Sequence, residues 1–351
     1  MFLRMPRRIL SCCFFLVAVA PAVQAYDPET GHLPLSSVAL DMYGQCFPEK
    51  QIFLNHYRAD ILAGDAMMDE GVLRGGKQVF SFWHSLFVKH ADIFEASERV
   101  FNWHFYNPER EALADIGVID QSLVGLYQKA QLGFVDNRDR SDKVFFMGAL
   151  AHLTEDLTVP AHVVPVYHGP VEAKLLSHGH IRPFVEYMKA HFVPLNDKLG
   201  APLLIKDPVD AAPVDMQQLP GQVAQYLQAQ GTTVCGYLAQ HPISTLDNFR
   251  DEVARHTLMF LETTTIERCE GLVWGDFWKK PEGTDYFGYY NTDFGNPLFN
   301  QPGTLVRRDK TCVFMGDAGK PDARYTQFVT QLHIFAVLDD LRLLDWETSR
   351  W

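Results

Sequence analysis

The sequence has 351 residues, of which 47% are hydrophobic and 21% are charged. A chain of this length and apolar content buries a sizeable core, which excludes an intrinsically disordered protein and favours one large domain. The formal net charge of −12 at pH 7 makes the surface a poor non-specific binder of nucleic acid, although it does not exclude a nuclease.

Residues 1–25 have the layout of a secretory signal peptide. The arginines Arg4, Arg7 and Arg8 precede an apolar run over residues 9–20, and the small-residue motif "VQA" follows it. Cleavage after this motif leaves residues 26–351 as the mature chain, which is expected to be secreted or periplasmic. Removal of the three arginines lowers the basic side chains from 31 to 28 against 43 acidic ones, so the mature net charge is about −15.

The mature chain keeps an even number of cysteines, which in an exported protein predicts one or two disulfides. They are Cys46, Cys235, Cys269 and Cys312. None forms a CxxC pair, which argues against a thiolate metal site. No later segment has the apolar length of a transmembrane helix, so we expect a soluble product.

The dominant period along the chain is helical, and alternating strand patterns are nearly absent. The expected helices cover residues 34–43, 49–63, 78–94, 109–134, 141–157, 183–192, 216–240, 245–271 and 326–346. We therefore predict an all-α fold, a compact multi-helix domain. Two tracts, 193–214 and 274–324, look irregular, and the second is rich in aromatic residues. This pattern leaves open a C-terminal lobe over about residues 272–351.

One stretch, "GALAHLTEDLTVPAH" at residues 148–162, places polar side chains in an otherwise apolar run. His152 and Asp156 are four residues apart, so they share a helix face within one turn. Pro160 should end or redirect the helix, after which a loop can return His162 toward that face. Two imidazoles and a carboxylate suit zinc. The alternative is an ordinary helix whose histidine and aspartate face solvent.

A second fragment, "NWHFYNP", places His104 among aromatic residues. Together the two fragments resemble the zinc-dependent phospholipase C family, which carries the motif H-x3-D-x5-H and a histidine in an "HFYDP"-like string. The family also has a "GAxxED"-like turn whose last carboxylate lies near the metals. The string "GDAMMD" puts Asp69 in that place, with Asp65 and Glu70 as competing positions. The resemblance covers roughly residues 26–192.

The resemblance extends to the start of the mature chain. The family has a histidine just before an amphipathic helix, matched by His32 in "GHLPLSSVAL". Family members often begin with a tryptophan whose free amine and carbonyl bind a metal, and this chain has Tyr26 instead. Because backbone atoms form that contact, Tyr26 keeps the ligand if cleavage occurs at this bond.

The sequence departs from the family pattern at a later H-x3-E motif. Here His180 and Glu186 are separated by more than one turn, and Pro183 lies between them. Proline belongs at a helix start, so Glu186 is expected in a first turn and His180 in the preceding loop. His178 and His168 are alternatives for the ligand paired with Glu186.

The resemblance implies two or three zinc ions. Their implied ligands are Tyr26, His32, Asp69, His104, His152, Asp156, His162, His180 and Glu186. Asp156 is a natural bridge between two ions, and Asp69 is the best candidate to accept a proton from a metal-bound water or to bind a metal.

The expected reaction is hydrolysis of the phosphodiester bond of a phospholipid, which yields diacylglycerol and a phosphorylated head group. One alternative is a zinc nuclease of the same superfamily that cuts single strands and removes 3′-phosphates. Another is a non-catalytic, metal-stabilised helical binding protein. The aromatic tract 285–299 suits contact with a membrane or micelle surface or a choline head group, or packing on the helices. No nucleic-acid partner is expected.

Overall fold

The computed structural model describes residues 28–70, 104–109, 122–164, 213–278, 302–307, 310–315 and 322–351. The predicted helices 78–94 and 183–192, and nearly all of the tract 193–214, lie outside these ranges. Within them the protein is predominantly helical, which confirms the predicted all-α class.

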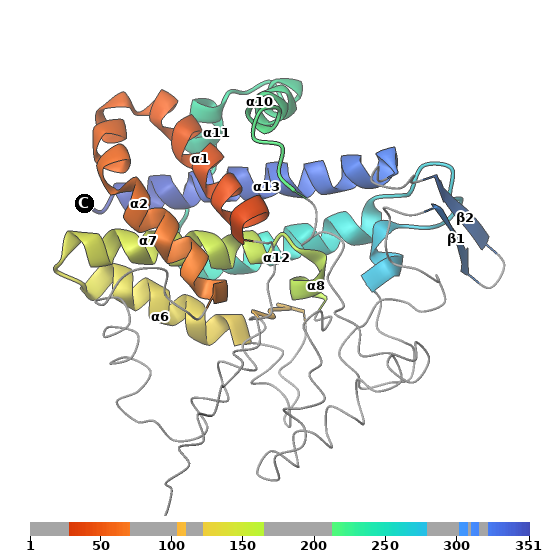
Figure 1. Ribbon diagram of the computed structural model, residues 1–351, viewed down its shortest axis with the longest axis horizontal. Coiled ribbons are helices and arrows are strands. Elements are labelled where there is room, and N and C mark those ends of the chain that lie inside the picture. Colours follow the sequence, from red (N-terminus) through yellow and green to blue (C-terminus); the bar gives the residue numbers. More distant parts are fainter. Residues whose placement is uncertain are drawn as a thin grey trace, which may run out of the picture.

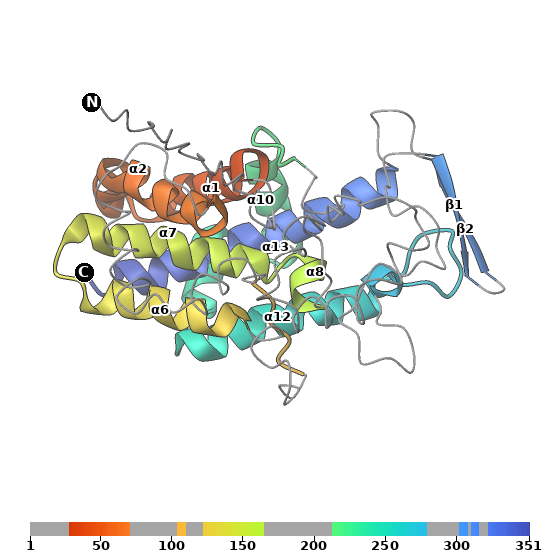
Figure 2. The same cartoon turned by 60° about the horizontal axis from the view of Figure 1, so that its bottom comes forward.

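The helices pack lengthwise into one bundle (Figure 1). In chain order the elements are η1 (Pro28–His32), α1 (Leu33–Cys46), α2 (Pro48–Glu70), α6 (Ser122–Asp136), α7 (Arg140–Asp156), α8 (Pro160–Val163), α10 (Leu219–Ala229), α11 (Val234–Gln240), α12 (Leu246–Thr263), η3 (Trp274–Trp278), β1 (Pro302–Arg307), β2 (Lys310–Met315) and α13 (Ala323–Thr348). Helices α2 and α6 pack on α7, while α1 packs on both α2 and α13. Helices α6, α7, α12 and α13 run along the long axis of the molecule (Figure 2).

Two helices, α7 and α13, form the centre of the bundle. Every residue over 144–156 in α7 and over 332–344 in α13 is buried. A helix that is buried on all sides lies inside a protein and has no solvent face. Polar side chains on these two stretches therefore face other protein groups instead of water.

Two glycines allow α2 and α7 to touch backbone to backbone. A Cβ atom on Gly64 would lie 1.8 Å from the carbonyl oxygen of Phe145, and one on Gly148 would lie 1.8 Å from that of Ile61. No larger side chain fits at either position without moving a helix. This contact sets the distance between the residue after Gly64, which is Asp65, and the inner turns of α7.

Of the predicted helices, one is divided in two and another ends earlier than expected. The helix predicted over 216–240 is two helices, α10 and α11, because Gly231 takes a left-handed backbone with φ of 74° and Thr233 caps α11 by accepting a hydrogen bond from Gly236 N–H. The helix predicted over 245–271 stops at Thr263. The chain after it is extended, and Thr265 pairs with Val273.

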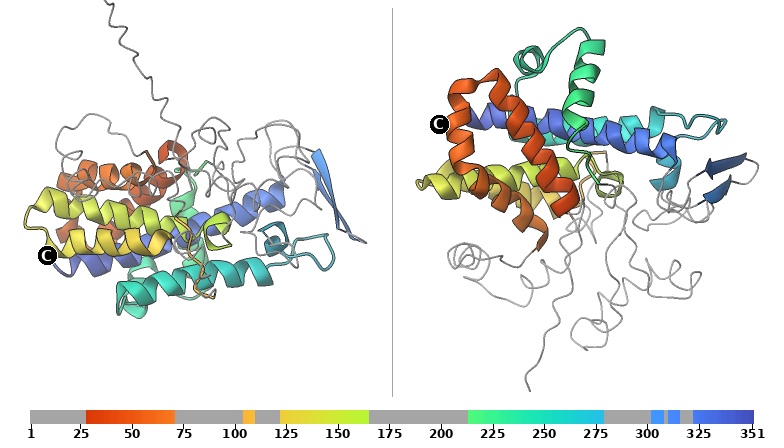
Figure 3. Two further views of the ribbon diagram at one scale, coloured as in Figure 1. Left: turned by 90° about the horizontal axis from the view of Figure 1, so that it is seen from below. Right: turned by 45° about the horizontal axis from the view of Figure 1, so that its top comes forward.

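The tract predicted to be irregular over 274–324 contains the turn η3 and one antiparallel pair, β1 and β2. The strands pair from Pro302 with Met315 to Arg307 with Lys310. This hairpin lies beyond the N-terminal end of α13, apart from the bundle (Figure 3). Helix α13 itself runs through the core. Within the predicted C-terminal lobe, the hairpin therefore lies apart from the bundle, whereas α13 lies inside it.

A disulfide joins Cys46 at the end of α1 to Cys235 in α11. Cys269 is also disulfide-bonded. Both findings agree with the even cysteine count of the mature chain. Among the described helices, none combines the length and the hydropathy that crossing a bilayer requires.

Candidate metal centre

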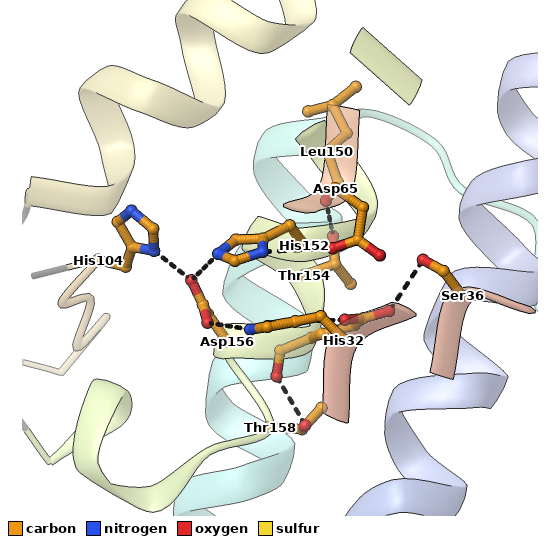
Figure 4. Close-up of polar contacts among 10 residues, drawn as sticks. His32, Ser36, Asp65, His104, Leu150, His152, Thr154, Asp156 and Thr158 are labelled. Atoms are coloured by element: carbon orange, nitrogen blue, oxygen red, sulfur yellow. Dashed lines mark hydrogen bonds and ion pairs between the residues drawn. The ribbon is translucent and has the colours of Figure 1, made fainter. Parts of the chain in front are cut away.

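Imidazole and carboxylate side chains from several segments meet at the C-terminal end of α7 (Figure 4). They are His32 of η1, Asp65 of α2, His104 of the segment 104–109, His152, Glu155 and Asp156 of α7, and His162 of α8. Each of these residues is at most 3% exposed. Their polar atoms therefore depend on one another, because bulk water does not reach them.

Helix α7 supplies the first pair of the centre. Its N-terminus is capped by Asp139, whose carboxylate accepts a hydrogen bond from Ser141 N–H at 2.8 Å. At the other end, the one-turn spacing brings His152 Nε2 to 3.4 Å from Asp156 Oδ2. Both residues are fully buried, which rules out the alternative of a solvent-facing pair.

The turn after α7 returns His162 to the same place. Val159 is extended, and Pro160 is the first residue of the one-turn helix α8, so His162 lies in a short helix and not in a loop. Its Nδ1 lies 3.1 Å from the carbonyl oxygen of His104, and its own carbonyl accepts a hydrogen bond from Tyr106 N–H at 3.0 Å. Two hydrogen-bond contacts, one from each segment, therefore hold the "HFYNP" string against α8, which ends the H-x3-D-x5-H motif.

Asp156 lies at the middle of the centre. His104 Nδ1 donates to its Oδ2 at 2.5 Å, and His32 Nε2 lies 3.5 Å from its Oδ1. Burial by itself would raise the pKa of this carboxyl. The positive charge of the neighbouring imidazoles outweighs burial and holds the pKa of Asp156 well below its usual range; these imidazoles are His152, His162 and His104. Asp156 is therefore ionised, and the surrounding imidazoles stabilise its negative charge.

Besides His104, three further histidines bond an oxygen atom through Nδ1. His32 contacts the Glu155 carboxylate through this atom, His152 contacts Asp65 Oδ1 at 3.3 Å, and His162 contacts a backbone carbonyl. An imidazole that donates through Nδ1 carries its lone pair on Nε2. This arrangement of a carboxylate or carbonyl behind each imidazole is the usual support of a metal-binding histidine.

The spacing of the inward-facing atoms would allow them to share one metal ion. Ligand atoms on one tetrahedral zinc, each about 2.0–2.2 Å from the ion, lie roughly 3.3 Å from each other. The nitrogen–oxygen distances from Asp156 to His152 and His32 are 3.4 and 3.5 Å. The ligand atoms of these three side chains all lie within 4.8 Å of one another. Asp156 Oδ1 and Asp65 Oδ2 accept no hydrogen bond within the described part of the chain, so a cation would satisfy buried oxygens that lack a donor.

The backbone of His104 is strained. Its φ of 51° lies in the left-handed region, which a histidine seldom adopts. The neighbouring Tyr106 holds the segment against α12: its hydroxyl donates to Asp251, and the guanidinium of Arg250 lies 4.7 Å from the centre of its ring. The strained conformation brings the His104 ring to Asp156.

Buried carboxyls continue from the centre into the core. Glu155, Asp340 and Glu347 are at most 1% exposed. Burial raises the pKa of all three well above the usual range, and an acidic neighbour raises each further. A cavity of about 10 Å³ borders Ser36, Asp340 and Glu347, about the room that one water molecule needs.

The structure places only some of the predicted site residues. It brings together His32, His104, His152, Asp156 and His162. Of the competing carboxylates, Asp65 is the one in contact with the centre, while Asp69 lies one turn further along α2 and its side chain is outside the described part, as is that of Glu70. The remaining candidates also lie outside the described residues: Tyr26, His168, His178, His180 and Glu186.

Sequence reasoning missed Glu155. It follows directly before Asp156 in the motif, and on a helix of unknown surroundings a glutamate suggests a solvent-facing position. The available signal was the apolar content on both sides of it, which indicated a buried helix.

Comparisons with known proteins give no relative for this chain. No family model, no curated protein and no solved structure matches it. The centre is therefore characterised by its own residues, as a buried set of imidazoles around one aspartate.

Proposed function

We propose that this chain is a zinc-dependent hydrolase that cleaves the phosphodiester bond of phospholipids and releases diacylglycerol and the phosphorylated head group. The observation that supports it best is the buried set of imidazoles around Asp156, whose nitrogen–oxygen separations suit zinc. The motif H-x3-D-x5-H and the string "HFYNP" link this centre to phosphodiester hydrolysis. In this proposal the mature enzyme is secreted or periplasmic and carries two or three zinc ions.

Asp156 would hold a metal ion together with His32 and His152. Its Oδ1 faces His32 Nε2, and its Oδ2 faces His152 Nε2. The Nδ1 contacts behind these imidazoles hold both rings in place before a metal arrives, which lowers the cost of ordering the ligands. Zinc bound here would supply positive charge to the phosphate oxygens and lower the pKa of a nearby water.

Asp65 is the described carboxylate best placed to accept a proton. One of its oxygens contacts His152 Nδ1 at 3.3 Å, and the other accepts no hydrogen bond within the described part of the chain. A carboxylate with one committed and one available oxygen holds its position and can still take a proton from a water at the centre. Asp69, one turn further along α2, remains the candidate that the sequence favours.

The substrate class follows from charge and from the sequence. A mature net charge of about −15 disfavours gathering a polyanion such as DNA. A phosphodiesterase that acts on lipid aggregates needs apolar or aromatic surface beside its metal centre. The aromatic tract 285–299 is the proposed source of that surface, and it lies outside the described residues.

Product analysis by mass spectrometry on mixed phospholipid micelles, with single-stranded DNA as a parallel substrate, tests the proposal. We expect diacylglycerol and a phosphorylated head group, with activity lost on adding o-phenanthroline and restored by zinc. Faster hydrolysis of DNA than of any phospholipid would assign the protein to the nuclease alternative. Bound zinc without turnover on either substrate would favour the non-catalytic binding protein.

The metal ligands are tested by His152→Ala. We expect bound zinc to fall and turnover to vanish while circular dichroism shows near-normal helical content, because the substitution removes a buried imidazole and leaves the helix intact. The matched control is His56→Ala, on the exposed face of α2, which should keep both zinc and activity. Unchanged zinc in His152→Ala by elemental analysis would contradict the assignment.

A further inference from the structure

Glu155 lies beside the proposed metal ligands and makes contacts of its own. Its carboxylate is fully buried, and both oxygens are engaged: Oε2 contacts His32 Nδ1, and Oε1 accepts a hydrogen bond from Ser36 Oγ at 3.1 Å. Figure 4 shows His32 between Asp156 on one side and Ser36 on the other. The contacts of Glu155 therefore lie on the side of His32 that faces away from Asp156.

The His32 ring is fixed in more than one direction. It stacks on the His152 ring with 3.8 Å between the ring centres. Its Nδ1 contacts Glu155, and its Nε2 lies 3.5 Å from Asp156 Oδ1. Stacking sets the plane of the ring, and the Glu155 contact sets its rotation within that plane. A proton on Nδ1 facing this carboxyl group would leave the lone pair on Nε2.

A carboxylate at position 155 is costly for folding. It is fully buried close to Asp65, and an apolar side chain at this position would avoid desolvating a polar group. A buried acidic side chain is informative when it makes a contact that an apolar residue cannot make. Here Glu155 contacts the imidazole of His32 directly.

We propose that Glu155 is a positioning residue that holds His32 in the Nδ1–H form and directs its Nε2 at a metal ion beside Asp156. The inference rests on the proposed metal binding and adds a residue of this chain to it. A carboxylate behind a ligating imidazole fixes its tautomer and raises its basicity, and loss of such a partner typically lowers metal affinity about 10- to 100-fold.

The competing interpretation makes Glu155 a ligand itself. The ligand atoms of His32, Asp65 and Glu155 also lie within 4.8 Å of one another. A ligand and a positioning residue differ in what their removal changes. Loss of a ligand lowers the number of ions bound, whereas loss of a positioning residue weakens binding at an unchanged number.

The variants Glu155→Leu and Glu155→Gln distinguish a ligand from a positioning residue. Glu347→Gln is the matched control, because it changes another fully buried glutamate that does not contact an imidazole of the centre. Zinc affinity is measured by competition with a chromogenic chelator, zinc content by elemental analysis, and ligand geometry by the visible spectrum of the cobalt(II)-substituted protein.

We expect Glu155→Leu to bind zinc about 10- to 100-fold more weakly at unchanged stoichiometry and with an altered cobalt spectrum. Glu155→Gln should recover most of the affinity, because its amide oxygen still accepts from Nδ1–H. Glu347→Gln should match the wild type. Ser36→Ala, which removes one hydrogen bond to Glu155, should weaken zinc binding by less than Glu155→Leu, and it serves as the test if the leucine variant does not fold.

Three results would overturn the inference. Wild-type affinity in Glu155→Leu, or in Ser36→Ala where the leucine variant does not fold, would show that His32 needs no support from Glu155. Loss of one zinc in Glu155→Gln would show that Glu155 is a ligand. Equal loss in Glu347→Gln would show a general effect of buried carboxyls. A wild-type protein that binds no zinc at all would instead reject the proposed function.

Discussion

Gly148→Ala tests whether the backbone contact between α2 and α7 sets the geometry of the centre. A Cβ on Gly148 would lie 1.8 Å from the carbonyl oxygen of Ile61 and 2.8 Å from the backbone nitrogen of Asp65. Ordinary contact begins at 3.4 Å, so α2 has to move by roughly 1.6 Å relative to α7. Both obstacles are backbone atoms, and no side-chain rotation relieves them.

The expected cost follows from this overlap. Overpacking of a tight interior costs about 1–3 kcal/mol, and the better helix propensity of alanine offsets less than about 1 kcal/mol of it. The net loss of about 1–2 kcal/mol lowers Tm by a few degrees. The same displacement lengthens the 3.3 Å contact between Asp65 and His152 beyond hydrogen-bond range. We therefore expect zinc binding to weaken about tenfold or more.

Calorimetry measures the change in Tm, and competition with a chelator measures the zinc affinity. Gly125→Ala in α6 is the matched control, because a Cβ there meets no atom within 4 Å. We expect this control to keep or slightly raise Tm and to leave zinc binding unchanged. If Gly148→Ala were as stable as Gly125→Ala and bound zinc like the wild type, the close approach of the two helices would be refuted.

Two further predictions concern stability. Burial raises the pKa of Glu347, and its acidic neighbour Asp340 raises it further. The contribution of protonated Glu347 to stability is therefore fully present below about pH 4.3, the pKa of an unfolded glutamate. This contribution is lost as pH rises through the raised pKa of the folded state. The glutamine in Glu347→Gln does not titrate, so the variant does not lose this contribution. In urea titrations, the unfolding free energy of the variant minus that of the wild type should therefore rise between about pH 5 and pH 8. The same pH dependence of the unfolding free energy in both proteins would contradict this. Replacing Cys46 and Cys235 by Ser opens a loop with a sequence separation of 189 and should cost about 5 kcal/mol, which an unchanged Tm in thermal unfolding would rule out.

The helices were predictable where their signals are local. The apolar period of residues 141–157 and 326–346 places α7 and α13 within a few residues of their observed ends. The break between α10 and α11 was missed because the period continues through Gly231, although Gly231 and Thr233 are ordinary cap residues. The hairpin was missed because its strands have only six residues each and directly follow the aromatic-rich part of a tract predicted to be irregular.

At the metal centre, too, local contacts were predictable from the sequence and long-range contacts were not. The spacing of His152 and Asp156 lies within one helical turn, so the sequence alone indicates that they meet. The choice between Asp65 and Asp69, which share one face of α2, depends on the position of α2 along its axis relative to α7. That axial position is set by the contact at Gly148, which joins residues far apart in the chain. The position of Glu155 required knowing that α7 is buried on all sides.

The left-handed backbone of His104 has a consequence for metal loading. A residue held in this conformation stores about 1–3 kcal/mol, which favours local opening of residues 104–109 and is opposed by their burial and hydrogen bonds. Any metal held by the His104 ring stabilises the closed segment by mass action, about 2.7 kcal/mol when free metal is a hundredfold above its dissociation constant. Local opening of this segment and release of the metal then become one linked equilibrium, and the free metal concentration outside the protein sets how often it opens.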